Sequence, residues 1–528
     1  MKILISDKMA EEGIKILREV KEFQVDVKTD YTPEQLTKAI KDYEAVIVRS
    51  ATKLKAEIIE AADKLRFIGR AGVGLDNVDL KAATKKGIVA MNTPAGNTTS
   101  TAEQTWSLIL ALSRNIPQAV ASLKSGKWER NKFEGVELHG KTIGIVGVGR
   151  IGSTVAKFAK SFNMRVIGFD PYLQKEVGEQ KGVEMYNDLH QLLKESDYIS
   201  IHIPKSSETK DLISDKEFNI MKKSARLINC ARGGIVNEAA LIKALEEKKI
   251  AGCALDVYEQ EPPDFNSPLF KFENCVCTPH LGASTEEAQI NVAIEIAQTI
   301  RDALLGKGIV NAANFPSVSA EEQKVLQPYI DLGLKMGRFS GQLVNGAIKE
   351  VRITYSGLMT DYKVAPITMS LVFGILSPIV GETVNFINAI DIAKERGIKL
   401  EAINAIQEQE FVNCIVAEII TDKETFTCWG TLSANKQPRI VKINNVYVEA
   451  VPEENMLFIN NNDKPGIVGA VGTILAEAKI NIAGITFGRE KKGGLAISVV
   501  NVDSEVPEKT IEKLKSTKDI LFVKFLKV

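Results

Sequence analysis

The stretch Lys141-Thr-Ile-Gly-Ile-Val-Gly-Val-Gly-Arg-Ile-Gly152, followed by Ser-Thr-Val-Ala-Lys-Phe-Ala, predicts a buried strand, a glycine turn and the start of a helix. Its glycines Gly147, Gly149 and Gly152 have the spacing G-x-G-x-x-G. The first permits a tight turn, the second lets backbone approach a pyrophosphate, and the third lets the helix pack closely on the strand. The helix start then offers unpaired N–H groups to phosphates. The stretch therefore predicts a Rossmann-like dinucleotide site.

A second predicted strand follows this helix and ends in an acidic residue. Arg165-Val-Ile-Gly-Phe-Asp170 places Asp170 18 residues after Gly152, close to the roughly 20 expected for a carboxylate that binds the ribose of a dinucleotide. The same carboxylate would repel a 2′-phosphate. We therefore expect NAD, and not NADP, as the cofactor.

Length and composition indicate a soluble protein of several domains. The 528 residues suffice for about three or four domains. Lys and Arg together number 67, as do Asp and Glu, so the charge favours neither nucleic acid nor an anionic membrane surface as a partner. The start of the chain predicts a strand and not a signal peptide, and the apolar run Leu371–Val380 is too short to span a bilayer. We expect a cytoplasmic protein.

The six cysteines suit a reducing compartment. Cys275 and Cys277 are alternate residues of a predicted strand, and we expect them to face opposite ways. We predict neither a disulfide nor a metal site for them.

Residues 1–97 alternate predicted strands and helices, which implies a parallel sheet covered by helices and an α/β fold class. Two loops at strand ends lie where open α/β sheets bind ligands. One is Arg49-Ser-Ala-Thr52, and the other is Gly69-Arg-Ala-Gly-Val-Gly-Leu-Asp76. The glycine-rich loop either presents backbone N–H groups to an anion or is an ordinary turn.

A break at Asn92-Thr-Pro-Ala-Gly-Asn97 precedes a long predicted helix, Ser100 to Ser113, which carries the chain into the next unit. The basic aromatic segment Lys127-Trp-Glu-Arg-Asn-Lys-Phe133 follows. On its own residues, this segment is a solvated loop anchored by one Trp.

Three polar residues each follow a later strand of the predicted dinucleotide-binding sheet. They are Arg232 in Asn229-Cys-Ala-Arg-Gly-Gly234, Glu261 before two prolines, and His280 after Thr278-Pro279. His is the side chain best suited to take a hydroxyl proton at neutral pH. A carboxylate would orient the ring, and a guanidinium would bind a substrate carboxylate in bidentate fashion. The alternative is a buried His beside a surface ion pair.

These motifs give the sequence a resemblance to a known family. The glycine loop, Asn229–Asn237, Ala254–Pro263 and Pro279–Thr285 resemble the D-isomer-specific 2-hydroxyacid dehydrogenases. The resemblance spans about residues 1–313. It implies a Rossmann-like NAD domain, residues 98–283, inserted in a discontinuous flavodoxin-like substrate domain, residues 1–97 and 284–313.

The resemblance also implies residue roles. His280 is the acid/base paired with Glu261, and Arg232 holds the substrate and polarises its 2-oxo group. NAD would contact Gly147, Gly149, Arg150, Ile151, Gly152, Asp170, Cys230, Ala231, Asp256, His280, Gly282 and Ala283. Val73 and Ile203 stand where relatives often have hydroxyl residues, so side-chain hydrogen bonds are lost there.

Within the family, Gly69–Asp79, Asn92–Thr98 and Gly126–Arg130 are similar to members that oxidise D-3-phosphoglycerate, the first step of L-serine biosynthesis. The substrate would then bind Arg49, Ser50, Gly72, Val73, Asn97, Arg130, Lys132 and Arg232. The basic segment 127–133 would reach the site from a neighbouring subunit, which implies a homodimer or homotetramer. An enzyme for another 2-hydroxyacid, such as glycerate or erythronate phosphate, and a NAD-sensing corepressor remain the alternatives.

The C-terminal third predicts two further domains. Residues 317–452 hold a predicted helix, Thr383 to Arg396, and alternating strands near Arg439–Val448. They are similar to the α+β intervening domain of longer family members, which is either an allosteric anion site or a spacer. Residues 454–528 predict the order βαββαβ, a ferredoxin-like unit.

The Asp463-Lys-Pro-Gly466 loop and Ile480-Asn-Ile482 make residues 454–528 similar to an ACT domain, which binds small amino acids where two copies pair. The implied L-serine ligands are Asn461, Asp463, Asn481 and Ile482. The alternative is a dimerisation module without an effector.

Overall fold

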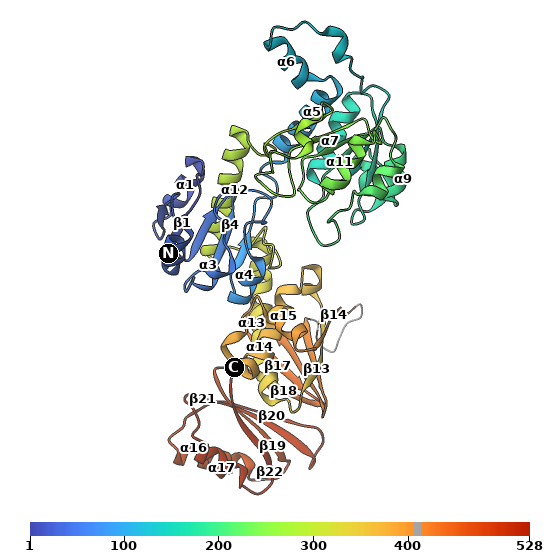
Figure 1. Ribbon diagram of the computed structural model, residues 1–528. Coiled ribbons are helices and arrows are strands. Elements are labelled where there is room, and N and C mark those ends of the chain that lie inside the picture. The colour runs from blue at the N-terminus through green and yellow to red at the C-terminus, as the bar shows by residue number, and fades with distance from the viewer. Residues whose placement is uncertain (406–410, 412) are drawn as a thin grey trace.

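The computed structural model describes residues 1–405, 411 and 413–528, which form four β-sheets with their helices. Figure 1 shows the units following one another along an elongated molecule, with the dinucleotide-binding lobe at one end and the C-terminal domain at the other. Parallel sheets, a mixed sheet and an antiparallel sheet appear in that order, which agrees with the predicted fold class.

The first sheet has the flavodoxin-like order β2-β1-β3-β4-β5, with every pair parallel. Its strands are β1 (Lys2–Ile5), β2 (Gln24–Val27), β3 (Ala45–Val48), β4 (Phe67–Arg70) and β5 (Val89–Met91). Alternate side chains of β1, β3, β4 and β5 enter two separate cores, as the two-residue period of a strand requires. One face is covered by α2 (Pro33–Ala39), α3 (Ala56–Glu60) and α4 (Leu80–Lys86), and the other by α1 (Glu11–Arg18) and α12 (Glu286–Leu304).

The second sheet has the order β12-β11-β10-β9-β6-β7-β8, which is the Rossmann arrangement extended by one strand. Its strands are β6 (Thr142–Val146), β7 (Arg165–Phe169), β8 (Glu184–Tyr186), β9 (Tyr198–Ile201), β10 (Arg226–Asn229), β11 (Gly252–Leu255) and β12 (Cys275–Cys277). The strands are apolar because helices cover both faces. These helices are α5 (Thr98–Ser113) and α7 (Arg150–Ser161) on one face, and α9 (Leu189–Glu195), α10 (Asp215–Ile220) and α11 (Glu238–Glu246) on the other.

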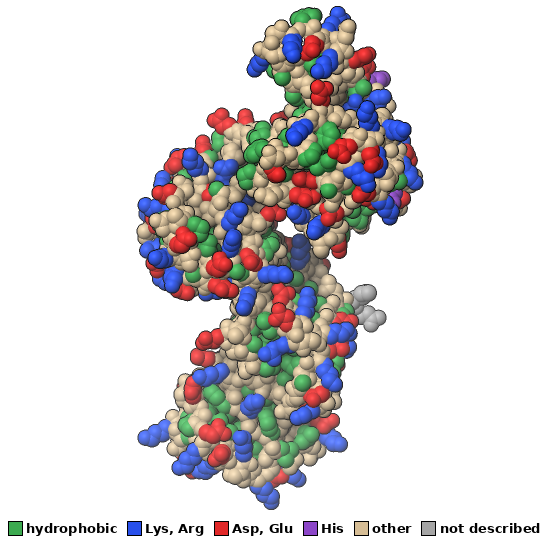
Figure 2. Space-filling model, in the orientation of Figure 1, with side chains coloured by type: hydrophobic (Ala, Val, Ile, Leu, Met, Phe, Trp, Pro, Cys, Tyr) green, Lys and Arg blue, Asp and Glu red, His purple; other side chains and the backbone are tan. Residues whose placement is uncertain are grey.

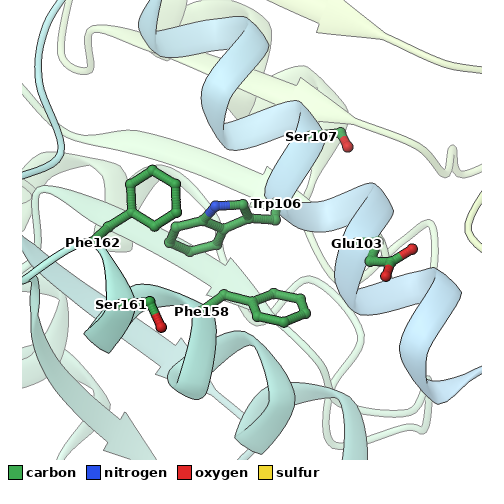
Figure 3. Close-up of a pocket in the computed structure, with 6 residues that line it drawn as sticks. All are labelled: Glu103, Trp106, Ser107, Phe158, Ser161 and Phe162. Atoms are coloured by element: carbon green, nitrogen blue, oxygen red, sulfur yellow. The ribbon is translucent and has the colours of Figure 1, made fainter.

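Two helices carry the chain between these sheets. α5 leaves the first sheet and packs on the second, where the Trp106 ring lies against Phe158 and Phe162 of the α7 region, with centroids 6.1 and 5.0 Å apart (Figure 3). α12 returns the chain and packs on α1 and β4. The chain therefore crosses between the lobes twice, near residues 92–98 and 283–286, which makes those segments the natural hinge.

The third sheet is mixed, with the order β14-β13-β15-β16-β17-β18. Its strands are β13 (Ile348–Ser356), β14 (Lys399–Asn404), β15 (Cys414–Thr421), β16 (Thr425–Leu432), β17 (Pro438–Ile443) and β18 (Val446–Ala450). The two long helices of this unit, α13 (Ala320–Leu343) and α14 (Ala365–Val380), were not predicted from the sequence. They approach closely because Gly337 and Gly341 of α13 meet the backbone of α14. The helix predicted from Thr383 is shorter, since α15 spans Ala389–Glu395.

The apolar run Leu371–Val380 is part of a longer helical region than the sequence suggested. Residues Ala365–Thr383 are long and apolar enough to cross a membrane by length and composition alone. Half of this region is buried inside the protein, where α14 packs on α13 and contributes to the core of the third sheet. Its apolar character is that of a core helix.

The fourth sheet is antiparallel with the order β20-β21-β19-β22, the ferredoxin-like arrangement that βαββαβ predicts. Its elements are β19 (Asn455–Asn462), α16 (Ile467–Glu477), β20 (Ile482–Arg489), β21 (Leu495–Val502), α17 (Glu508–Lys515) and β22 (Ile520–Lys527). The face of this sheet that includes Phe458 packs on α13, where the rings of Phe339 and Phe458 meet edge to face with their centroids 5.9 Å apart. The last two units therefore share one hydrophobic core.

The expectation for Cys275 and Cys277 is wrong. Their sulfur atoms are 3.5 Å apart, and Cys253 of the neighbouring strand lies 3.1 Å from Cys275. Residues i and i+2 of a strand project from the same face, so the two thiols had to lie together. The cysteines are nevertheless free thiols. Among the described residues, no group of three or more His, Cys, Asp or Glu side chains could hold a metal ion.

Candidate active site

A cavity of about 580 Å³ lies between the first and second sheets, and we call it the cleft. Its walls come from the loops that follow the strands β4, β9, β10 and β12, so the carboxyl ends of strands from both sheets converge on it. Predicted site residues on its wall are Val73, Asn97, Ile151, Cys230, Ala231, Arg232, His280, Gly282 and Ala283. These nine are just under half of the nineteen residues that line the cleft.

The glycine loop has the geometry expected of a pyrophosphate cradle. Gly147 has φ 94°, and a Cβ on it would lie 2.7 Å from the carbonyl oxygen of His202. A Cβ on Gly152 would lie 2.0 Å from the carbonyl oxygen of Gly147. A Cβ on Gly149 would meet nothing within 4 Å, because this glycine faces open space at the start of α7. The first and third glycines are therefore required by the fold, and the second leaves room for a ligand.

Asp170 ends β7 beside this loop. Its carboxylate accepts hydrogen bonds from the backbone N–H of Val148, at 3.0 Å, and of Tyr172, at 3.1 Å. A carboxylate has further lone pairs, so these bonds fix its position and leave acceptor capacity for a ribose hydroxyl. The loop and Asp170 together fit a dinucleotide.

His202, at the end of β9, lines the cleft without the features of a catalytic group. Burial lowers its pKa to about 3, so the ring is neutral, and its Nε2 pairs with the hydroxyl of Ser200 at 2.8 Å. His202 is therefore a structural lining residue of the cleft.

His280 and Glu261 form the hydrogen-bonded pair predicted for proton transfer. Nδ1 of His280 lies 2.7 Å from Oε2 of Glu261. Burial alone would raise the pKa of Glu261, but its hydrogen bond and charge interaction with His280 lower it, with help from the Tyr258 N–H and Arg232. The pair leaves Nε2 of the imidazole for a substrate hydroxyl. His280 also has φ 56°, an uncommon backbone conformation for a non-glycine residue that often marks functional sites.

Asp256 holds the loop that carries His280. Its buried carboxylate accepts from the N–H groups of Leu281 and Gly282, both at 2.8 Å, and from the Thr278 hydroxyl at 2.6 Å. The Thr101 hydroxyl of α5 also donates to the Gly282 carbonyl, at 3.0 Å. Asp256, predicted to contact NAD, lies behind the cleft wall in this structure, where it shapes the loop.

Arg232 reaches across the cleft to the first lobe. Its Nε donates to Asp76 at 3.1 Å, and its Nη1 donates to the Ala231 carbonyl at 2.7 Å. Arg70, at the end of β4, lies on the same wall and was missed by the sequence analysis. Its buried Nε has no hydrogen-bond partner among the described residues. Burial and then the charge of Arg232 lower the pKa of Arg70 to about 10, so it remains a cation at neutral pH.

Five predicted substrate residues are not among the residues that line the cleft of their own chain. Arg49 Nη1 donates to the carbonyl of Lys8, and Ser50 follows it on the exposed side of the loop. Arg130 and Lys132 lie in the short helix η2 (Arg130–Phe133), beyond α6 (Ile116–Lys124). We call residues 116–133 the arm, because this segment projects from the second lobe (Figure 1). Gly72 lies nearer to the cleft than the other four residues, because a Cβ on it would collide with the guanidinium of Arg70, which lines the cleft.

The predicted serine ligands have mixed surroundings. Asp463 accepts from Arg489, at 3.1 Å, and from the Gly493 N–H, at 2.9 Å; these bonds lower its pKa. Asn481 donates to Asp503 at 2.7 Å. Asn461 is buried and pairs with the Ser498 hydroxyl, while Ile482 begins β20. Among the described residues, no hydrogen bond joins the pair Asn461 and Asp463 to the pair Asn481 and Ile482.

Three family models match consecutive parts of the chain. The NAD binding domain of the D-isomer specific 2-hydroxyacid dehydrogenases matches residues 106–282. The D-3-phosphoglycerate dehydrogenase intervening domain matches residues 325–444, and the ACT domain matches residues 455–519. The order agrees with that predicted from the sequence motifs.

Curated relatives match over nearly the whole chain. The D-3-phosphoglycerate dehydrogenase of Methanocaldococcus jannaschii is 43% identical over 98% of this chain and 98% of its own length. That of Bacillus subtilis is 39% identical over 99% of each. The chain belongs to the D-3-phosphoglycerate dehydrogenase family. NAD is therefore the cofactor, as the motif around Gly149 and Asp170 predicted.

Two solved structures resemble about three fifths of the chain. The TT0316 protein from Thermus thermophilus has a TM-score of 0.55 at 32% identity, over 59% of this chain and all of that protein. The D-lactate dehydrogenase of Aquifex aeolicus, complexed with NAD and lactic acid, has a TM-score of 0.54 at 29% identity, over 60% of this chain and all of that protein. The catalytic part of the D-3-phosphoglycerate dehydrogenase family thus shares its fold with dehydrogenases of other 2-hydroxyacids.

Proposed function

We propose that this protein oxidises D-3-phosphoglycerate to 3-phosphohydroxypyruvate with NAD, the first step of L-serine biosynthesis. The observation that carries the proposal is the 2.7 Å pair of His280 and Glu261 on a cleft that also holds Arg232 and Arg70. A base, a carboxylate that orients it and two cations match a substrate that has a hydroxyl, a carboxylate and a phosphate. The names of the full-length relatives support the same substrate.

The residues divide the reaction between them. His280 takes the proton of the 2-hydroxyl at Nε2, since Glu261 engages Nδ1. Glu261 orients the ring and stabilises the imidazolium that forms. Arg232 binds the substrate carboxylate and polarises the oxygen that becomes the ketone. NAD, when bound, accepts the hydride from C2. The loop at Gly149, together with Ile151, Asp170, Cys230, Ala231 and Ala283, would hold it in place.

Arg70 supports the phosphorylated substrate over an unphosphorylated 2-hydroxyacid. A buried cation without a partner is costly unless an anion joins it. The unpartnered Nε of Arg70 and its position on the cleft wall suit the substrate phosphate. Val73 and Asn97 also line the cleft, whereas Arg49 and Ser50 follow the neighbouring strand β3 and lie outside the cleft lining.

The test is NADH production from D-3-phosphoglycerate and from D-glycerate. We expect the wild type to prefer the phosphorylated substrate. His280→Ala should lower kcat by at least about 100-fold while NAD still binds. Arg70→Met should raise KM for phosphoglycerate by about 100-fold, with the KM for D-glycerate almost unchanged. Near-normal turnover of His280→Ala, or equal use of both substrates by the wild type, would contradict the proposed reaction.

We further propose that L-serine inhibits the enzyme through the ACT domain. The two candidate pairs, Asn461 with Asp463 and Asn481 with Ile482, would face each other from two copies of the domain. A serine titration of the NADH assay tests this. Inhibition at micromolar to millimolar serine, weakened by Asn481→Ala, is expected. No inhibition of the wild type at 10-fold higher serine would refute the effector site.

We also propose that the enzyme is an oligomer in the cytoplasm. Its substrate domain would span residues 1–97 and 284–313, its NAD domain 98–283, its intervening domain 317–452 and its ACT domain 454–528. The arm supports an oligomer, because its apolar side chains Ile116, Val120, Leu123 and Trp128 are exposed, Trp128 by 83%. Arg130 and Lys132 at its end would then supply cations to the partner's cleft. The face of the molecule in Figure 2 has acidic and basic side chains intermixed, without one large patch of either sign.

A further inference from the structure

We propose that Asp76 is a positioning residue that holds the guanidinium of Arg232 in the orientation that binds the substrate carboxylate. The inference rests on the proposed function, because it concerns the carboxylate next to the oxidised carbon. Asp76 follows β4 of the first sheet, and Arg232 follows β10 of the second. Their contact therefore crosses the cleft. Among the described residues, it is the one ion pair between residues 98–283 and residues 1–97 or 284–313.

Three contacts locate the guanidinium. Nε donates to Asp76 Oδ2 at 3.1 Å, and Nη1 donates to the Ala231 carbonyl at 2.7 Å. Nη2 lies over the backbone of Gly74, where a Cβ would be only 1.9 Å away. Asp76 uses a donor on the side of the fork, so N–H groups of Nη1 and Nη2 remain for a bidentate carboxylate. Arg232 is thus oriented before substrate arrives.

The loop that carries Asp76 is itself fixed. The amide of Asn77 donates to the carbonyl oxygens of Arg49 and Thr52, both at 2.6 Å. The N–H of Leu54 donates to the Asn77 carbonyl at 2.8 Å. A rigid loop places the Asp76 carboxylate at a defined point, which a positioning role requires.

Charge explains why Arg232 needs this partner. Arg70 lies on the same wall, and the two guanidiniums repel each other, as the effect of Arg232 on the pKa of Arg70 indicates. Asp76 offsets this repulsion for both. Without it, Arg232 has a free path to turn toward solvent. The pair contributes little to stability, because the Asp76 side chain is 63% exposed and exposed ion pairs contribute little.

The experiment compares Asp76→Ala, Asp76→Asn and the control Asp63→Ala, which removes an exposed carboxylate of the same lobe away from the cleft wall. Each variant is assayed in the full-length protein for kcat and for the KM of phosphoglycerate and of NAD. We expect Asp76→Ala to raise the KM of phosphoglycerate by about tenfold, with kcat and the KM of NAD within about threefold of the wild type. Asp76→Asn keeps an acceptor for Nε but removes the charge, so its KM for phosphoglycerate should lie between those of Asp76→Ala and the wild type.

An unchanged or lower KM in Asp76→Ala would overturn the inference, since Asp76 would then be idle or a competitor of the substrate. A loss in Asp76→Asn equal to that in Asp76→Ala would also overturn it. If the wild type uses D-glycerate and not phosphoglycerate, the proposed function fails, and the same variants are compared with D-glycerate. That substrate has the same carboxylate beside its hydroxyl carbon, so the role of Asp76 is decided separately.

Discussion

The pair of His280 and Glu261 contains a carboxyl whose pKa is changed by folding. The folded state lowers the pKa of Glu261 below its ordinary value of 4.5. The contribution of the pair to stability is therefore complete above about pH 4.5 and is lost as pH falls through the lower, folded value. Since Glu261 is partly exposed, this contribution is small, and the main effect is on catalysis.

We predict that Glu261→Gln lowers kcat by at least about tenfold, because the amide orients the ring but does not stabilise the imidazolium. The pH dependence of kcat/KM should also differ from that of the wild type, because the titratable carboxyl of Glu261 is replaced by a neutral amide. Steady-state assays from pH 5 to 10 measure both effects. A profile identical to that of the wild type would show that Glu261 is not the partner during catalysis.

At the scale of elements, the turn between β6 and α7 separates folding from binding. Gly152 is needed for packing, because a Cβ would lie 2.0 Å from a carbonyl oxygen of the same turn. Gly149 has free space at that position and φ −71°, which any residue adopts. The same Gly→Ala substitution meets different surroundings at these two positions, so each variant is the control for the other.

We predict that Gly149→Ala keeps the thermal unfolding midpoint of the wild type within about 2 °C and weakens NAD binding by at least about tenfold, because the new methyl group occupies the pyrophosphate position. Gly152→Ala should lower the midpoint by several degrees, since backbone must move. Thermal denaturation and titration calorimetry with NAD measure the two effects. Equal NAD affinity in Gly149→Ala and the wild type would place the pyrophosphate elsewhere.

At the scale of the whole molecule, one chain brings Arg70, Arg232 and His280 to its own cleft but not Arg130 and Lys132. The arm that holds the latter pair is exposed and apolar along α6. An arrangement in which each arm serves a neighbouring cleft explains both facts. The third and fourth sheets also share one hydrophobic core, so we expect a structural change in the ACT domain to affect the intervening unit.

Exchange of subunits tests this arrangement. The double variant Arg130→Ala, Lys132→Ala and the single variant His280→Ala should each have low activity. We predict that mixing them under conditions of subunit exchange restores up to about half of the wild-type activity per mixed dimer, because one cleft then has an intact His280 and an intact arm from its partner. No recovery, with mixed dimers confirmed by mass spectrometry, would indicate that the arm acts within its own chain.

Local sequence by itself determined the parts of this protein that depend on neighbours in the chain. The spacing of Gly147, Gly149 and Gly152 is a requirement of one turn, and Arg232 and His280 follow strands whose carboxyl ends meet at a common edge in any open α/β sheet. The order βαββαβ likewise fixes a ferredoxin-like unit. These features were predictable because their geometry is set within a few residues or by topology.

Only the tertiary structure decided which side chains face one another across elements. Arg70 looked like one residue of a glycine-rich loop until folding left its buried Nε without a hydrogen-bond partner among the described residues. Asp76 gained its role by meeting Arg232 from the other lobe. Helix α13 was missed although Ser319 and Glu322 form a capping box that the sequence shows. The close glycine packing of α13 on α14 exists only once both helices are paired. Burial, desolvation and charge repulsion depend on the whole environment of a group, and a linear pattern does not contain that environment.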